Sequence, residues 1–194
     1  MEYISKKWNL AWQRYYELFS SLTLAKKLSL SLGFAVLTGI SAQLYIRLPF
    51  TPVPFTGQVF TVLLAGVLLG KNFGAISQLI YMAGGSMGIN WFFASGAGFF
   101  RHTTGYIIGF AMAAYLIGYM TEKRRSLKAR LLAMLLGVIV ILTSGSLWLS
   151  LFLRMPLPKA FAAGFLPFIA FDALKAYLAG MAANSILKNS GAGK

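Results

Sequence analysis

The chain has 194 residues, of which 58% are hydrophobic and 11% charged, and its mean hydropathy is +0.69. These values are typical of an integral membrane protein and exclude an ordinary soluble domain. The net charge of +14 does not indicate nucleic-acid binding, because the basic residues separate apolar runs instead of clustering on a soluble surface.

Residues 1–27 form a basic segment in which aromatic residues recur at helical spacing, namely Trp8, Trp12, Tyr15 and Phe19. This pattern favours an amphipathic helix lying in the membrane interface, and a mobile basic tail is the alternative. The segment is not a signal peptide, because the first long apolar run begins only after Lys27. We therefore expect two parts, the segment 1–27 and a single membrane domain over residues 28–190.

The first predicted span covers residues 28–46, which carry no charge. At 1.5 Å per residue it is long enough to cross a hydrocarbon core of roughly 30 Å. Ser31, Ala35 and Gly39 are spaced four apart and form a stripe of small residues on which another helix can pack closely. The partner helix is either part of this chain or part of a coupling protein.

A connector at residues 47–58 contains three prolines and is predicted to be a stiff, non-helical loop. The second span follows at 59–70 and ends at a glycine, and the third covers 75–88. Only residues 71–74 separate these two spans, so we expect them to be antiparallel neighbours.

Glycines and aromatic residues alternate over residues 88–103, which form either an interfacial aromatic belt or a lid over a ligand. A fourth span is predicted at 103–121, a basic loop at 122–130 and a fifth span at 131–153. Pro156 and Pro158 then break the chain before the sixth span, at 159–187.

The distribution of basic residues orients these six spans. With the N-terminus inside, thirteen basic residues are internal and only Arg47, Arg101, Arg154 and Lys159 are external. The internal ones are Lys6, Lys7, Arg14, Lys26, Lys27, Lys71, Lys123, Arg124, Arg125, Lys128, Arg130, Lys188 and Lys194. The positive-inside rule therefore predicts an all-α integral membrane protein with six transmembrane helices and both termini in the cytoplasm.

Asp172 and Lys175 lie in the middle of the last apolar segment. A charged residue within a membrane costs roughly 2.5 to 3.5 kcal/mol on insertion scales, so such residues usually have a function. Their i, i+3 spacing places both on one helical face. They are interpreted as a polar ligand site, and a structural ion pair is the alternative.

Four segments together resemble the BioY family, the biotin-specific S components of bacterial energy-coupling-factor (ECF) transporters. They are TPVPFTGQVFTVLLAGVLLG (51–70), GAISQLIYMAGGSMG (74–88), TGYIIGF (104–110) and PFIAFDALK (167–175). The resemblance implies six helices, a biotin site near the outer face and high-affinity biotin uptake across the bacterial cytoplasmic membrane. It also implies partnership with a transmembrane coupling subunit and two ABC-type ATPases, in contact with membrane lipids. The chain departs from the family at GINWFFA and RHTTGY, so a related small vitamin remains an alternative ligand.

Biotin has a ureido ring with two N–H donors and a carbonyl, and a carboxylate on a flexible apolar chain. Asp172 can accept hydrogen bonds from the ureido N–H groups, and Lys175 can donate to the ureido oxygen or to the carboxylate. Arg101 is a second candidate for the carboxylate. The other candidate ligand-binding residues are the polar Asn90, Gln58, Thr56 and Tyr106 and the apolar Trp91 and Phe92.

An intramembrane enzyme is the main rival hypothesis, but the sequence contains no cysteine and a single histidine, His102, at the end of a span. With four acidic residues in the whole chain we expect neither a metal site nor a resident cofactor. A channel or self-contained transporter would need inverted repeats or a polar path, and neither is visible. The sequence contains no P-loop motif, so we expect partners to hydrolyse ATP.

Overall fold

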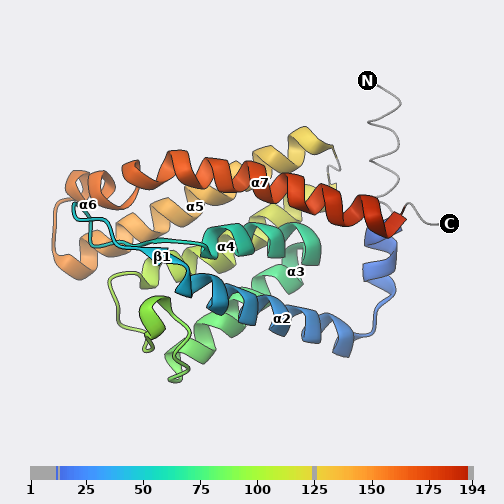
Figure 1. Ribbon diagram of the computed structural model, residues 1–194, viewed down its shortest axis with the longest axis horizontal. Helices are drawn as coiled ribbons and strands as arrows, with labels where there is room; N and C mark the ends of the chain where they lie inside the picture. Colours follow the sequence, from blue (N-terminus) through green and yellow to red (C-terminus); the bar gives the residue numbers. More distant parts are fainter. Residues whose placement is uncertain (1–11, 13, 124–125, 192–194) are drawn as a thin grey trace.

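The computed structural model describes residues 12, 14–123 and 126–191, which form a bundle of long helices with one short two-stranded sheet (Figure 1). The elements are α2 (Leu24–Gln43), β1 (Tyr45–Ile46), β2 (Phe55–Thr56), α3 (Gln58–Ser86), the 3₁₀ turn η1 (Phe93–Ser95), α4 (Thr104–Lys123), α5 (Leu127–Leu153), α6 (Leu157–Gly164) and α7 (Leu166–Gly191). We call the end with β1, β2, η1 and α6 the loop end. The opposite end, where α4 ends and α5 begins, is the base. Five of the described helices are long and apolar enough to cross a membrane.

Helix α2 begins after Thr23, whose hydroxyl accepts a hydrogen bond from the Lys26 backbone, and it ends at Gln43, three residues before the predicted end. The chain leaves the helix there because Tyr45 and Ile46 pair with Phe55 and Thr56 in an antiparallel ladder. This ladder ties both ends of the proline-rich connector together at the loop end.

The stripe of small residues on α2 faces the protein interior. Ser31 and Ala35 are fully buried, and the Ser31 hydroxyl donates to the Phe73 carbonyl at 3.0 Å. A methyl group on Gly39 would come within 3.0 Å of Trp91. The hypothesis that a coupling protein docks on this stripe is therefore wrong, and the internal alternative is correct.

Helix α3 is a hairpin of two arms, because Gly70 has φ of 73° and ψ of −177°. The arms are antiparallel, as expected: Gln58 near the start hydrogen-bonds Tyr81 near the end, and Gly74 packs against Ala65. The reversal occurs at Gly70, whereas the predicted turn at 71–74 is helical. The position tolerates φ above zero because glycine has no Cβ.

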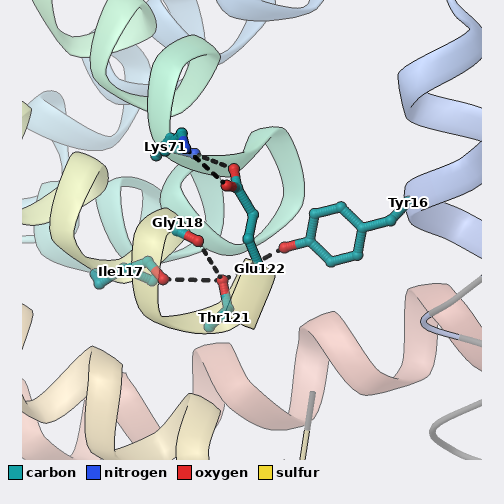
Figure 2. A network of polar contacts seen from close by, with 6 residues as sticks. All are labelled: Tyr16, Lys71, Ile117, Gly118, Thr121 and Glu122. Atoms are coloured by element: carbon teal, nitrogen blue, oxygen red, sulfur yellow. Dashed lines mark hydrogen bonds and ion pairs between the residues drawn. The ribbon is translucent and has the colours of Figure 1, made fainter. Parts of the chain in front are cut away.

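Glu122 of α4 holds this reversal at the base (Figure 2). One carboxylate oxygen accepts from the Lys71 backbone N–H at 2.9 Å, and the other lies 3.5 Å from the Lys71 ammonium. The carboxylate thus satisfies a backbone donor at the start of the second arm, where a helix lacks its own acceptors.

Residues 14–21 are helical and pack against the bundle at the base. The hydroxyls of Tyr15 and Tyr16 donate to the carbonyls of Leu68 and Val67 at 2.9 and 3.1 Å, and Tyr16 also lies 3.4 Å from the Thr121 hydroxyl (Figure 2). Trp12 is 1% exposed and covers the Arg130 guanidinium at 4.2 Å. These aromatic side chains contact the bundle, and the predicted position of the segment in the membrane interface stays a prediction for the described residues. Trp8 lies outside them.

Helices α4 and α5 approach closely through glycines. A methyl group on Gly105 or Gly145 would collide with Trp148 or Tyr106 respectively, on the facing helix. Both helices agree with the predicted fourth and fifth spans, although α5 begins at Leu127, four residues early.

The predicted sixth span is two helices, which is a correction. Helix α6 ends at Gly164, and α7 begins at Leu166 and runs back along the bundle from the loop end (Figure 1). Phe165 and Pro167 lie at the break, and a proline cannot donate to a preceding turn. Asp172 is thereby placed about 9 Å along α7 from its start, because a helix rises 1.5 Å per residue.

Candidate ligand-binding site

A cavity lies inside the loop end of the bundle, between the connector, both arms of α3 and helices α4, α5 and α7. It is bounded by polar groups and by aromatic and aliphatic walls. The lining residues are Val53, Pro54, Thr56, Gln58, Val59, Tyr81, Phe92, Phe93, Thr103, Tyr106, Ile107, Phe110, Ile141, Leu142, Phe168, Asp172 and Lys175. Its volume is about 50 Å³. Pockets for small molecules usually hold about 300–1,000 Å³, so a vitamin-sized ligand requires these walls to move apart.

Asp172 and Lys175 form the charged part of the cavity. Asp172 is 2% exposed, and its Oδ1 accepts from the Lys175 ammonium at 2.7 Å. The same ammonium donates to the Thr56 carbonyl at 2.7 Å and lies 3.8 Å from the centre of the Phe55 ring. The predicted i, i+3 pairing is therefore confirmed. The pair also joins α7 to the end of the connector, so it has a structural role in addition to any contact with a ligand.

The second oxygen of Asp172 accepts no hydrogen bond from the described residues. A buried carboxylate can accept several hydrogen bonds, and an oxygen left without one is costly in a low dielectric. The cavity therefore presents an acceptor that suits the N–H groups of a bound molecule.

A chain of neutral hydrogen bonds begins at Thr56, whose carbonyl accepts from Lys175. The Thr56 hydroxyl donates to Gln58 Oε1 at 3.0 Å, and Gln58 Nε2 donates to the Tyr81 hydroxyl at 2.7 Å. Tyr81 lies 3.3 Å from the Trp91 carbonyl, to which it donates. This chain crosslinks the two arms of α3 and the following loop, so it fixes the position of Gln58 beside the cavity.

Tyr106 and Phe92 form part of the remaining wall. The Tyr106 hydroxyl donates to the Gly164 carbonyl at 2.8 Å, which ties α4 to the break between α6 and α7. Phe92 is 2% exposed and packs edge-on against Tyr81. Six of the nine predicted residues thus line the cavity: Asp172, Lys175, Gln58, Thr56, Tyr106 and Phe92.

The other three predicted residues do not line it. Asn90 is exposed at the loop end. Trp91 lies behind Tyr81, where its Nε1 donates to the Tyr81 carbonyl at 2.9 Å. The half-buried Arg101 has its guanidinium 5.2 Å from the centre of the Phe93 ring, and its Nη1 donates to the Ala97 carbonyl at 3.4 Å. The direction in which each side chain of this irregular loop points could not be predicted from the sequence, because the loop has no periodic structure.

Sequence analysis missed several lining residues, of which Tyr81 and Phe168 are the most informative. Tyr81 lines the cavity because the hairpin of α3 brings the second arm back beside Gln58. Phe168 lies four residues before Asp172 and therefore on the same face of α7. That spacing was visible in the sequence, whereas the meeting of residues 58 and 81 required the antiparallel pairing of the arms.

The described helices define a multi-pass helical membrane protein, with an internal cavity lined in part by a buried ion pair. Residues 12–191 match the family model described as the BioY family. The chain belongs to the BioY family, as the resemblance of its four segments predicted.

Named relatives support this assignment. The chain is 39% identical over 170 residues to a probable biotin transporter BioY of Pyrococcus horikoshii, covering 86% of this chain and 99% of the relative. It is 35% identical over 147 residues to the biotin transporter BioY of Thermotoga maritima, covering 74% and 86%. A crystal structure of the S-component for biotin from an ECF-type ABC transporter superposes with a TM-score of 0.80 at 28% identity, covering 87% of this chain and 95% of that one.

Proposed function

We propose that the chain binds biotin with high affinity and is the substrate-specific subunit of an ECF-type transporter for its uptake. Relatives named biotin transporters and the similarity to a biotin S-component support this proposal. The single observation that carries it is the buried Asp172–Lys175 pair in the cavity, with one carboxylate oxygen that accepts no hydrogen bond from the described residues. The named relatives are transporters, so a catalytic role is not proposed.

In this proposal the ureido N–H groups donate to Asp172, and Lys175 or the Gln58 amide donates to the ureido oxygen. All three side chains already lie on the cavity wall, so binding needs little reordering of the polar groups. The sulfur ring and the apolar chain then contact the walls formed by Phe92 and Phe168. Entry of the ligand widens the cavity, and the aromatic loop around Phe92 is an irregular segment that can move.

We further propose that the protein crosses the bacterial cytoplasmic membrane six times, with the loop end outside. The two arms of α3 count as two crossings because they are antiparallel. The excess of basic residues on the base side supports cytoplasmic termini. A transmembrane coupling subunit and two ABC-type ATPases are the proposed partners, because the resemblance to the S components of ECF transporters implies them and a related solved structure is an S-component from an ECF-type ABC transporter. The division into a segment 1–27 and a membrane domain 28–190 stays a prediction; within the described residues, hydrogen bonds from Tyr15 and Tyr16 tie the segment to α3.

Calorimetric titration of the detergent-purified chain tests the ligand. Biotin should bind, and lipoic acid, which also has a sulfur ring and a carboxylate but no ureido group, should bind at least about tenfold more weakly. The reason is that hydrogen bonds to charged groups contribute about 1.5 to 3 kcal/mol, and about 1.4 kcal/mol is a factor of ten. Equal affinity for the two acids, or no binding of biotin, would contradict the proposal.

A further inference from the structure

A second hollow lies outside the cavity at the loop end. It is an open groove of about 320 Å³, larger than the 50 Å³ of the cavity. Arg47, Thr51 and His102 lie on its rim. The groove and the cavity have three lining residues in common, Val53, Pro54 and Phe93. A molecule in the groove therefore lies directly against the wall of the cavity.

The charged groups at the groove are all cationic. Arg47 is exposed on its rim, and the Arg101 guanidinium lies 5.2 Å from the Phe93 ring centre. No acidic residue of the described chain lines the groove: Glu17 and Glu122 lie at the base, and Asp172 is paired inside the cavity. The groove therefore has a positive potential that attracts anions.

His102 adds a polar atom that has no partner. Its Nε2 is buried and makes no hydrogen bond, and the Pro52 carbonyl lies near enough to the ring to act on its pKa. Its ring packs edge-on against Phe93 at 6.0 Å. Burial lowers the pKa of His102 below its ordinary value, and Arg101 lowers it further, against the effect of the Pro52 carbonyl. The neutral ring thus keeps Nε2 as an acceptor, and protonation would turn it into a donor for an anion.

We propose that this groove is an outer subsite for the carboxylate of an incoming ligand, a monocarboxylate with a flexible apolar chain. Arg47 attracts the carboxylate, and protonated His102 donates to it. The apolar part then lies along Val53 and Phe93, beside the cavity. The inference rests on the proposed function for the identity of the ligand, but it concerns how the ligand arrives and not how it is held inside.

Stopped-flow measurement of association tests the subsite with two ligands, biotin and its neutral carboxamide, biotinamide. Arg47→Gln should slow biotin association about fivefold, because two charges about 4 Å apart in water interact by enough for a factor of that size. Association of biotinamide and the dissociation rates of both ligands should not change. Lys159→Gln is the matched control, since Lys159 is exposed at the same end on α6 and does not line the groove.

The pH dependence tests His102 separately. The wild type should bind biotin faster as the pH falls from 8 towards 5.5, because His102 becomes protonated below its ordinary pKa of about 6.5 while a carboxylate stays mostly ionised. His102→Gln should remove this acceleration. The charged groups beside the ring are Arg47, which lines the same groove, and Arg101.

Several results would overturn the subsite. These are an unchanged biotin association rate in Arg47→Gln, an equal slowing for biotinamide, an equal effect of Lys159→Gln, or an acceleration at low pH that persists in His102→Gln. Each of them leaves biotin binding by the wild type intact. Failure of the wild type to bind biotin or biotinamide would instead refute the proposed function, so the two failures are distinguishable.

Discussion

Replacing Asp172 by asparagine removes the one negative charge that lines the cavity and keeps the shape of the side chain. The Lys175 ammonium would lose its 2.7 Å contact with Oδ1 and retain only the Thr56 carbonyl and the Phe55 ring. Hydrogen bonds to charged groups contribute about 1.5 to 3 kcal/mol, so biotin affinity should fall at least about tenfold.

The same substitution should lower the free energy of unfolding. Breaking a buried ion pair from one side costs about 3 to 5 kcal/mol. We expect a value at or below the lower end of this range, because the Lys175 side chain is 13% exposed and keeps the Thr56 carbonyl as an acceptor.

Titration with biotin and thermal melting of the same detergent samples separate the two effects. The double variant Asp172→Asn/Lys175→Met is the control, because it removes the unpaired charge and should recover part of the melting temperature but none of the affinity. An Asp172→Asn protein that melts early yet binds biotin with wild-type affinity would refute the reasoning and would leave the pair a purely structural role.

Three further predictions concern the hairpin, the topology and the cavity wall. Gly70→Ala should lower the melting temperature, because a Cβ would lie 2.6 Å from Glu122 Oε1. In addition, φ of +73° with ψ of −177° is a backbone conformation essentially restricted to glycine, and another residue held there costs about 1–3 kcal/mol. Gly33→Ala on the open face of α2 should not lower the melting temperature, and equal melting of the two variants would contradict this. The topology predicts that the cysteine of Ser126→Cys reacts with an impermeant maleimide only after cell lysis. The cysteine of Phe50→Cys, at a position that is 68% exposed, should react in intact cells. The reverse pattern would contradict the proposed topology. Tyr81→Phe should weaken biotin binding by about threefold to tenfold in a titration, because Gln58 loses the acceptor that orients it, and unchanged affinity would show that Gln58 does not bind the ligand.

The sequence alone was enough to predict the membrane-protein class, the approximate helices and the pairing of Asp172 with Lys175. Each rests on local information. A helix long enough to span a bilayer needs a long apolar run, and two residues at i and i+3 share a face wherever the helix packs. Gly70 at the end of an apolar run likewise predicted the end of a helix, whereas the chain reversal predicted at 71–74 occurs at Gly70 itself.

Only the tertiary structure decided which groups meet across the bundle. Gln58 reaches Tyr81 because the arms of α3 fold back on each other, and the stripe containing Ala35 faces α3 and not another protein. In the aromatic loop the backbone is irregular, so adjacent residues diverge: Phe92 enters the cavity while Trp91 packs behind it. Such contacts depend on how distant segments pack together, and a periodic pattern in one segment contains no information about the segment that it will face.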